Sequence, residues 1–362
     1  MADTDALRGA CLGFAHTQAR GFSPLYERLV LGIANDRELL HLLGEAPAGQ
    51  RRPTLLLAAV HDLLLGGSSH PLSDFYLSVT DTPRTDDPYL AFQDFCHTFR
   101  SGIESRIARG ATQTNEVRRA AALMVGLNHV QAATSQPLRL VELGASAGLL
   151  LAFDRYRFEF SRSQIGLPTS SVRIPVSTDD ETEALLSNVP SLASRTGIDL
   201  QPIDLQDSAQ RQWLDAFVWP EASNDRTRLR AAMQLVAEDP PQVLQGDVIE
   251  MLPNILADET SECHVVVFHT TLLTYLDRAQ RQTLFSILAG AGASRDLSWL
   301  PLEAPGFLIQ ADAAFDIPTT VAKDNSRLVL AARRWTSSVP HDSVLARVDA
   351  YGRGIDRGWA SN

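Results

Sequence analysis

The first 135 residues carry apolar positions at the spacing of helices. Ser23-Pro24 is a typical helix start, because serine caps a helix and proline suits its first turn. Residues 54–65 are apolar on nearly every side, as in a buried helix, and residues 89–109 are expected to form one further helix. No alternating strand pattern occurs in this part of the chain. The pattern therefore predicts a helical N-terminal domain over residues 1–135.

After residue 136 the pattern changes to short apolar or alternating runs separated by helical segments. Strands that alternate with helices are typical of a mainly parallel sheet covered by helices on both faces. We therefore expect a Rossmann-like, doubly wound α/β domain over residues 136–362, with a Ser/Thr/Pro-rich insertion near residues 161–195. The runs that predict its strands are residues 138–142, 156–160, 195–204, 242–247, 264–268, 306–310 and 327–331, and helices are expected at 118–130, 149–153, 213–218, 227–237 and 277–289.

A glycine-rich turn follows the first predicted strand. Gly144, Ala145, Ser146, Ala147 and Gly148 separate the strand from the apolar start of the next helix. Glycine tolerates positive φ and leaves room where a Cβ would stand, so a ligand could approach the backbone N–H groups of such a turn. The sequence therefore predicts a ligand site around this turn.

Acidic residues stand at or near other strand ends. In an open α/β sheet, ligands bind beyond the carboxyl ends of the strands. A nucleoside would place its ribose hydroxyls on Asp199 or Asp204 and an amino group of its base on Asp247, which is followed by Val248. Asp199 or Asp204 in a turn and Asp247 as a helix cap are the structural alternatives.

Glu142 lies inside the apolar first strand, where a carboxylate needs a partner. An ammonium group on the ligand would be such a partner, and S-adenosylmethionine carries one beside its sulfonium. His269, directly after a buried strand, is the candidate general base; a structural histidine is the alternative.

Thr114, Asn115 and Glu116 lie just before the helix that leads into the first strand. We expect them to reach the cofactor pocket, with helix capping by Thr114 as the alternative. The helical N-terminal domain is expected to act as a lid that adds substrate contacts.

Composition narrows the classes of partner. The 362 residues carry a formal net charge of −11 with an isoelectric point near 5.3 and no basic run, which argues against a nucleic-acid partner. Three dispersed cysteines predict reduced thiols in a cytoplasm, and no Cys/His spacing suggests a metal. No apolar run reaches about 18 residues, and the acidic N-terminus does not look like a signal peptide, so neither a membrane span nor secretion is expected.

Several motifs together resemble an uncharacterised bacterial family, the domain of unknown function numbered 2332. The resemblance covers nearly the whole chain and implies no established activity. The residues that carry it are Thr112-Gln-Thr-Asn-Glu-Val117, Val141-Glu-Leu-Gly-Ala-Ser-Ala-Gly-Leu149, Asp154-Arg-Tyr156, Arg195-Thr-Gly-Ile-Asp-Leu-Gln-Pro202, Trp219-Pro220 and Val267-Phe-His-Thr270.

More loosely, the glycine turn, Gly197-Ile-Asp-Leu-Gln-Pro202 and Gly246-Asp247-Val248 look like successive motifs of class I S-adenosylmethionine-dependent methyltransferases. That resemblance implies cofactor contacts by Glu142, Gly144, Gly148, Asp199 and Asp247. Two features depart from it: Ser146 replaces a middle glycine, and Gly148 and Asp199 are about 50 residues apart where roughly 20 is usual. The insertion accounts for the excess, or residues 156–160 form the second strand instead.

Two other readings compete with methyl transfer to a small acceptor. The turn matches G-x-S-x-G, so Ser146 could be a hydrolase nucleophile with Asp247 and either His269 or His341. That fold needs several strands before the serine, where the present pattern is helical. A non-catalytic nucleoside-binding protein is the third reading. The sequence gives neither the acceptor nor the oligomeric state.

Overall fold

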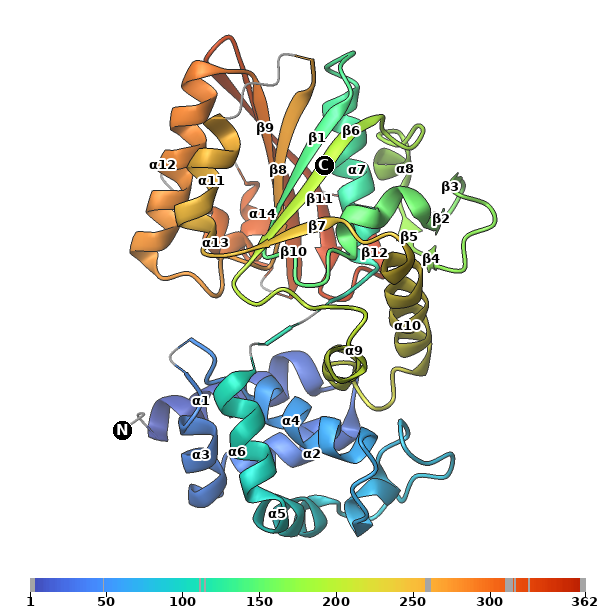
Figure 1. Cartoon of the computed structure of the whole chain (residues 1–362), viewed down its shortest axis with the longest axis vertical. Helices are drawn as coiled ribbons and strands as arrows, with labels where there is room; N and C mark the ends of the chain where they lie inside the picture. Colours follow the sequence, from blue (N-terminus) through green and yellow to red (C-terminus); the bar gives the residue numbers. More distant parts are fainter. Residues whose placement is uncertain are drawn as a thin grey trace. The chain divides into compact units, whose positions relative to one another are not determined.

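The computed structural model describes residues 4–47, 49–110, 112–113, 115–257, 262–309, 315, 317–324 and 326–358. The chain forms two compact units with a mixed α/β content (Figure 1). The first comprises Met1–Thr114 and Gln206–Arg230, and the second comprises Asn115–Leu205 and Ala231–Asn362. The predicted helix at 118–130 is part of the second unit. In the described ranges, no helix combines the length and apolarity needed to span a bilayer.

The described part of the first unit is helical. Ser23 caps α2 as expected, since its hydroxyl accepts from the Tyr26 N–H at 3.0 Å and Pro24 occupies the first turn. Helix α4 is buried on most sides, as its apolar sequence predicts. The elements are α1 (Thr4–Phe14), the π-helix η1 (Ala15–Ala19), α2 (Pro24–Ile33), α3 (Arg37–Gly44), α4 (Pro53–Leu65), the 3-10 helix η2 (Pro71–Phe75), α5 (Tyr89–Thr98), α6 (Arg100–Arg109), α9 (Ser208–Ala216) and the first half of α10 (Ser223–Glu238).

The single helix expected over residues 89–109 is wrong. The structure has α5 and α6 there, separated at Phe99, whose backbone leaves the helical region with φ −105° and ψ 24°. The apolar residues keep a helical spacing across the break, from Phe95 through Phe99 to Ile103. Because periodicity reports only which face is buried, it did not reveal the change of direction.

The second unit is built on a nine-stranded sheet in the order β5-β12-β11-β10-β9-β8-β1-β6-β7, with a separate small sheet β3-β2-β4. Its strands are β1 (Leu138–Leu143), β2 (Arg157–Glu159), β3 (Gln164–Gly166), β4 (Arg173–Pro175), β5 (Ser177–Thr178), β6 (Leu192–Asp199), β7 (Gln242–Gln245), β8 (His264–Thr270), β9 (Leu297–Glu303), β10 (Arg327–Thr336), β11 (Val339–Asp349) and β12 (Gly354–Asp356). Its helices are α7 (Arg119–Gln131), the 3-10 helix η3 (Leu150–Arg155), α8 (Asp180–Glu183), the second half of α10, α11 (Val248–Ala257), α12 (Arg278–Ser294), α13 (Pro305–Ile309) and α14 (Thr319–Ala322).

Strands β7, β6, β1, β8 and β9 are parallel, whereas β10 and β11 are antiparallel to their neighbours β9 and β10. The chain runs outward from β1 through β6 to β7 and then returns to β8 on the other side of β1 (Figure 1). Strand order therefore reverses between β1 and β8. Ligands bind open α/β sheets at the carboxyl ends of the strands beside such a reversal.

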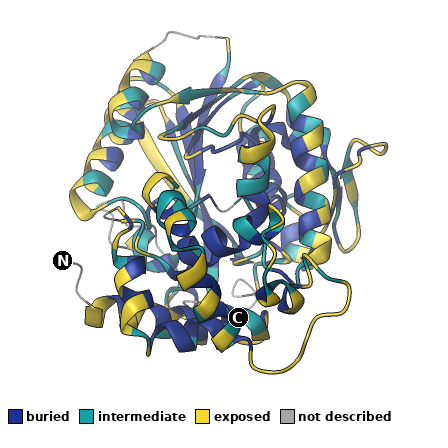
Figure 2. Cartoon of the chain, turned by 60° about the horizontal axis from the view of Figure 1, so that its bottom comes forward, coloured by how far each residue is buried: buried dark blue, intermediate teal, exposed yellow. Residues whose placement is uncertain are grey.

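Helices cover both faces of this sheet (Figure 1). A Cβ built on Gly126 of α7 would lie 3.1 Å from Leu300, and one built on Gly292 of α12 would lie 2.3 Å from the Trp335 ring, so these helices pack closely on the strands. Trp335 pairs with Leu297 of β9, so these two side chains point to the same face of the sheet. Because side chains alternate along a strand, Leu300, three residues after Leu297, points to the opposite face. Figure 2 shows the resulting burial, with most of the central strands in dark blue.

The pairing also fixes the direction of Glu142. It lies beside Phe268 of β8, and Phe268 lies beside Leu300 of β9. Paired residues on adjacent strands point to the same face. Glu142 therefore lies on the face that α7 covers.

One strand was expected in the wrong place, and two long strands, β9 and β11, were not expected. Residues 306–310 were expected as a strand, but α13 covers Pro305–Ile309, and residue 310 lies outside the described residues. The actual strand, β9, contains Pro301, a residue that argues against a central strand because it lacks an N–H. Strand β11 was missed because its first half is polar and exposed.

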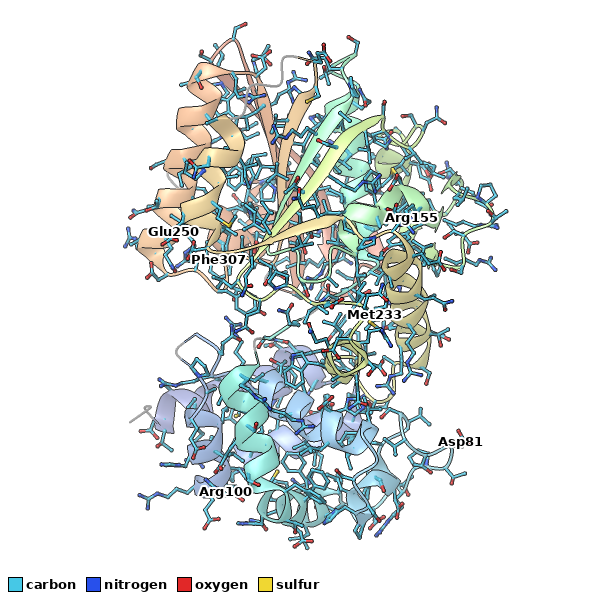
Figure 3. The ribbon with its side chains drawn as sticks, viewed as in Figure 1. Asp81, Arg100, Arg155, Met233, Glu250 and Phe307 are labelled. Atoms are coloured by element: carbon cyan, nitrogen blue, oxygen red, sulfur yellow. The ribbon has the colours of Figure 1, made fainter. Side chains whose placement is uncertain are left out.

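The segment after the glycine turn is a short 3-10 helix, η3, with a non-helical Ala152, where a regular helix was expected. Arg155 at its end donates to the carbonyl oxygens of Leu235 and Asp239, at the C-terminal end of α10 (Figure 3). An arginine suits that position, because unpaired carbonyls and the helix dipole make a helix C-terminus negative.

Candidate functional site at the carboxyl ends of β1, β6, β7 and β8

The glycine turn packs tightly against the neighbouring strands. Gly144, Ser146 and Gly148 adopt positive φ values of 75°, 52° and 70°. The amides of Gly144 and Ala145 both donate to the Ile198 carbonyl of β6, at 2.8 and 3.1 Å. A Cβ at Gly148 would stand 2.5 Å from Pro241, so that position requires glycine for space as well as for conformation.

The turn does not offer the row of amides that its sequence suggested. The N–H groups of Gly144, Ala145, Ser146 and Gly148 all donate to acceptors inside the protein. These glycines therefore serve close packing of the turn on the sheet. Recognition of a ligand at these strand ends falls mainly to side chains.

Asp199, the last residue of β6, is brought directly to the turn. One carboxylate oxygen accepts from the Ser146 N–H at 2.8 Å and the other from the Gln201 N–H at 2.8 Å. Strand β6 lies beside β1, while residues 157–159 form β2 of the small sheet, so Asp199 ends the neighbouring strand despite the long spacing in sequence. Asp204 lies beyond the strand end and is exposed.

Asn115 also reaches the turn: its side-chain amide donates to the Ser146 hydroxyl at 2.8 Å. Glu116 accepts from the Arg118 N–H at 3.1 Å, just before α7. Thr114 lies outside the described residues. The segment before α7 therefore contacts the glycine turn through Asn115.

Glu142 is 3% exposed, and its Oε2 atom has no hydrogen-bond partner in the described part of the chain. Burial, and to a smaller extent the negative charge of Asp199, raise the pKa of the Glu142 carboxyl well above its ordinary value of 4.5. A buried carboxyl without a partner is costly, and such groups are concentrated at functional sites. Glu142 therefore marks this strand end as a candidate binding position.

Asp247 and Val248 have visible structural roles. The carboxylate of Asp247 accepts from the Ile249 N–H at 2.7 Å, which is the capping alternative foreseen from the sequence. Gly246 donates to the Asp199 carbonyl at 2.9 Å, so the end of β7 lies beside the end of β6. Val248 is buried in the apolar core under α11.

His269 does not have the geometry of a general base. Its side chain is fully buried, and the Trp299 indole donates to Nε2 at 3.0 Å, which leaves the proton on Nδ1 because an indole N–H can only donate. Nδ1 in turn lies 2.8 Å from Glu303 Oε1. Both ring nitrogens are thus engaged inside the protein. His269 is therefore a structural histidine, the alternative that the sequence analysis gave to a general base.

Replacing His269 with alanine should lower the free energy of unfolding by about 2–4 kcal/mol, since it empties a filled position and removes two buried hydrogen bonds. Denaturant titration measures this loss. His341, exposed on β11, is the matched control, and its alanine variant should stay within about 0.5 kcal/mol of the parent protein. A His269→Ala protein as stable as the parent would contradict the structural role.

Two residues at these strand ends, Arg119 and Glu303, were not predicted from the sequence. Arg119, at the start of α7, is 6% exposed and donates from Nη1 to the Thr271 hydroxyl at 2.8 Å and from Nη2 to the Ala350 carbonyl at 3.3 Å. Glu303, at the end of β9, accepts from the amides of Leu272 and Leu273 at 2.6 and 3.0 Å. The sequence held one signal for Arg119. A cation in the first turn of an apolar helix interacts unfavourably with the helix dipole, which indicates that the arginine has a specific contact or role there.

In the ranges that the structure describes, no three histidine, cysteine or acidic side chains are grouped to hold a metal ion. A comparison with curated proteins finds no match to the chain. The family described as "Uncharacterized protein conserved in bacteria (DUF2332)" matches residues 8–357, almost the full length. The protein therefore belongs to the bacterial DUF2332 family.

Proposed function

We propose that the second unit binds S-adenosylmethionine at the carboxyl ends of β1, β6, β7 and β8 and transfers its methyl group to a small acceptor. The observation that carries the proposal is the buried carboxyl of Glu142, whose Oε2 has no hydrogen-bond partner among the described residues, beside the point where strand order reverses. The strand order β7-β6-β1-β8-β9 is that of the first five strands of a Rossmann-like sheet, in the order 3-2-1-4-5. Adenosyl cofactors bind such sheets at this edge.

The residues present fit the groups of this cofactor. Glu142 supplies an acceptor for the ammonium group, which would satisfy Oε2 and favour the ionised carboxylate. Each oxygen of Asp199 accepts one backbone N–H and retains lone-pair capacity for a ribose hydroxyl. Asp247, at the neighbouring strand end, is available in the same way to an amino group of the base.

S-Adenosylmethionine supplies an electrophilic methyl group on a sulfonium. The protein's contribution to such a reaction is chiefly alignment of the acceptor with the methyl carbon and the sulfur. The buried turn and the side chains of Glu142 and Asp199 would hold the cofactor, and with it the sulfur and the methyl carbon, in a fixed position for this alignment. With His269 engaged elsewhere, we assign no general base, and the lid role of the helical unit stays a prediction.

Isothermal titration calorimetry with S-adenosylmethionine and with S-adenosylhomocysteine tests the proposal. We expect saturable binding of both ligands with one site per chain and a dissociation constant on the order of micromolar, in the range usual for enzyme ligands. ATP and adenosine serve as control ligands that share the nucleoside but lack the amino-acid end. Absence of binding to either sulfur compound at about 1 mM would remove the methyltransferase proposal.

One observation favours a serine hydrolase as the second candidate: Ser146 has the left-handed φ expected of a strained nucleophile turn. However, its hydroxyl is bound to Asn115, and in the described part of the chain no histidine ring contacts it. We therefore expect a fluorophosphonate probe to leave the protein unlabelled, as judged by intact-protein mass spectrometry. Labelling that disappears in a Ser146→Ala variant would reverse the ranking of the two functions.

A further inference from the structure

We propose that Arg119 binds the carboxylate at the amino-acid end of the ligand, so that Arg119 and Glu142 together recognise a zwitterionic amino-acid group. This inference rests on the proposed function and deepens it, because it assigns a binding residue that the sequence motifs did not indicate.

The Arg119 guanidinium is buried without a counter-charge. It is 6% exposed, and no carboxylate of the described chain lies within 4 Å of it. Nη1 and Nη2 each donate to a neutral oxygen, and Nε has no hydrogen-bond partner in the described residues. An uncompensated buried cation costs several kcal/mol, so a binding partner of opposite charge would stabilise it strongly.

The nearest acidic groups are committed elsewhere. Glu116 and Glu303 act on Arg119 only from beyond ion-pair distance, where they offset part of the effect of burial, which lowers the pKa of the guanidinium. Glu303 Oε1 already accepts from His269 and from the amides of Leu272 and Leu273. Glu303 thus lies in the neighbourhood of Arg119 without forming an ion pair with it. The guanidinium is therefore available for an anionic group of a ligand.

Thr271 provides the second donor. It adopts φ 54°, a left-handed conformation that is unusual for a β-branched residue, and Glu303 holds the amides that follow it. Strain of this kind persists where the surrounding structure enforces it, often at ligand sites. The Thr271 hydroxyl accepts from Arg119 and keeps its own hydrogen to donate to an anion, so guanidinium and hydroxyl form a pair of donors suited to a carboxylate.

The two charges lie at adjacent strand ends. Glu142 is on β1 and Thr271 follows β8, its direct neighbour, at the point where strand order reverses. Glu142 points to the face covered by α7, and Arg119 is the first residue of α7. A carboxyl and a guanidinium on one face of the same sheet edge complement the ammonium and the carboxylate of an α-amino acid.

Three adenosyl ligands separate these contributions in calorimetry. S-Adenosylmethionine has both groups, its decarboxylated form lacks the carboxylate, and 5′-methylthioadenosine lacks both. Because a charge-assisted hydrogen bond contributes about 1.5–3 kcal/mol, the parent protein should bind S-adenosylmethionine about 10- to 100-fold more tightly than the decarboxylated form. In Arg119→Gln that ratio should fall to about threefold or less, while affinity for the decarboxylated ligand stays within about threefold.

Arg119→Lys is the second variant, in case Arg119→Gln does not fold; it keeps the charge, loses the planar fork and should keep an intermediate ratio. Arg333→Gln is the matched control, since Arg333 is a partly buried arginine that pairs with Asp342 on the neighbouring strand, and its ratio should equal that of the parent. Equal affinity of the parent for both sulfonium ligands, or an equal loss of both in the Arg119 variants, would overturn the role of Arg119 while the proposed function stands. No binding of any adenosyl ligand to the parent would instead remove the proposed function.

Discussion

Asp199→Ala is expected to lower the affinity for S-adenosylmethionine at least about 100-fold, which is the largest effect that we predict for a single substitution in this site. The carboxylate has two tasks: it accepts the Ser146 and Gln201 amides, and in the proposed complex it accepts from the ribose. Its removal leaves the N–H of the buried Ser146 unpaired, which costs about 1–3 kcal/mol of stability, and it removes charge-assisted bonds to the ligand. Calorimetry measures the affinity, and denaturant titration measures the free energy of unfolding.

Asp204→Ala is the matched control for that experiment. Asp204 lies five residues along the chain and is exposed, so its replacement should leave both stability and affinity within experimental error. If Asp204→Ala weakens binding and Asp199→Ala does not, the ribose contact has been given to the wrong acid. If neither variant changes the affinity, the ligand does not occupy the end of β6.

Glu142→Gln should make the protein more stable and the binding weaker. Burial raises the pKa of the Glu142 carboxyl above 4.5, so at neutral pH the folded state keeps a proton that the unfolded state has released, or holds a buried charge. Either condition lowers the free energy of unfolding. A neutral glutamine of the same shape removes this penalty, while a contact to the ligand's ammonium group loses its charge.

The sign of the pH dependence follows from linkage. Below about pH 4 the carboxyl is protonated in both states, and the parent and Glu142→Gln should have similar stability. Above the ordinary pKa of 4.5 only the unfolded state loses its proton, so the stability of the parent falls as pH rises towards the raised pKa of the folded state. By pH 8 the variant should be the more stable of the two, because the folded parent then bears the full cost of the raised pKa of Glu142.

Binding supplies an independent readout for Glu142. If the carboxyl ionises when it meets the ammonium group, the parent should release a proton on binding S-adenosylmethionine, which appears as a dependence of the measured heat on the ionisation enthalpy of the buffer. Glu142→Gln should bind about 10- to 100-fold more weakly and show no such release. A variant that is less stable than the parent at pH 8 and binds equally well would show that Glu142 is part of the core and not of a binding site.

The sequence by itself determined the elements whose signals are local. The Ser23-Pro24 start of α2, the all-round apolar helix α4, and the apolar strands β1 and β8 were predicted because capping, periodicity and the burial of apolar runs depend on neighbouring residues. The glycine turn was found for the same reason. Where the local signal points the wrong way, as at Pro301 within β9 or at the unbroken apolar spacing across Phe99, prediction failed.

The tertiary structure alone decided which chemistry-bearing residues meet. Asp199 contacts Ser146 across 53 residues of chain, Arg119 contacts Thr271 across 152, and the roles of His269's two nitrogens come from Trp299 and Glu303 on the next strand. It also turned four amides of the glycine turn inward and, among the described residues, left Glu142 Oε2 and Arg119 Nε without hydrogen-bond partners. Hydrogen bonds and burial depend on distances between strands, and those distances are set by strand order, which residue spacing along the chain does not encode.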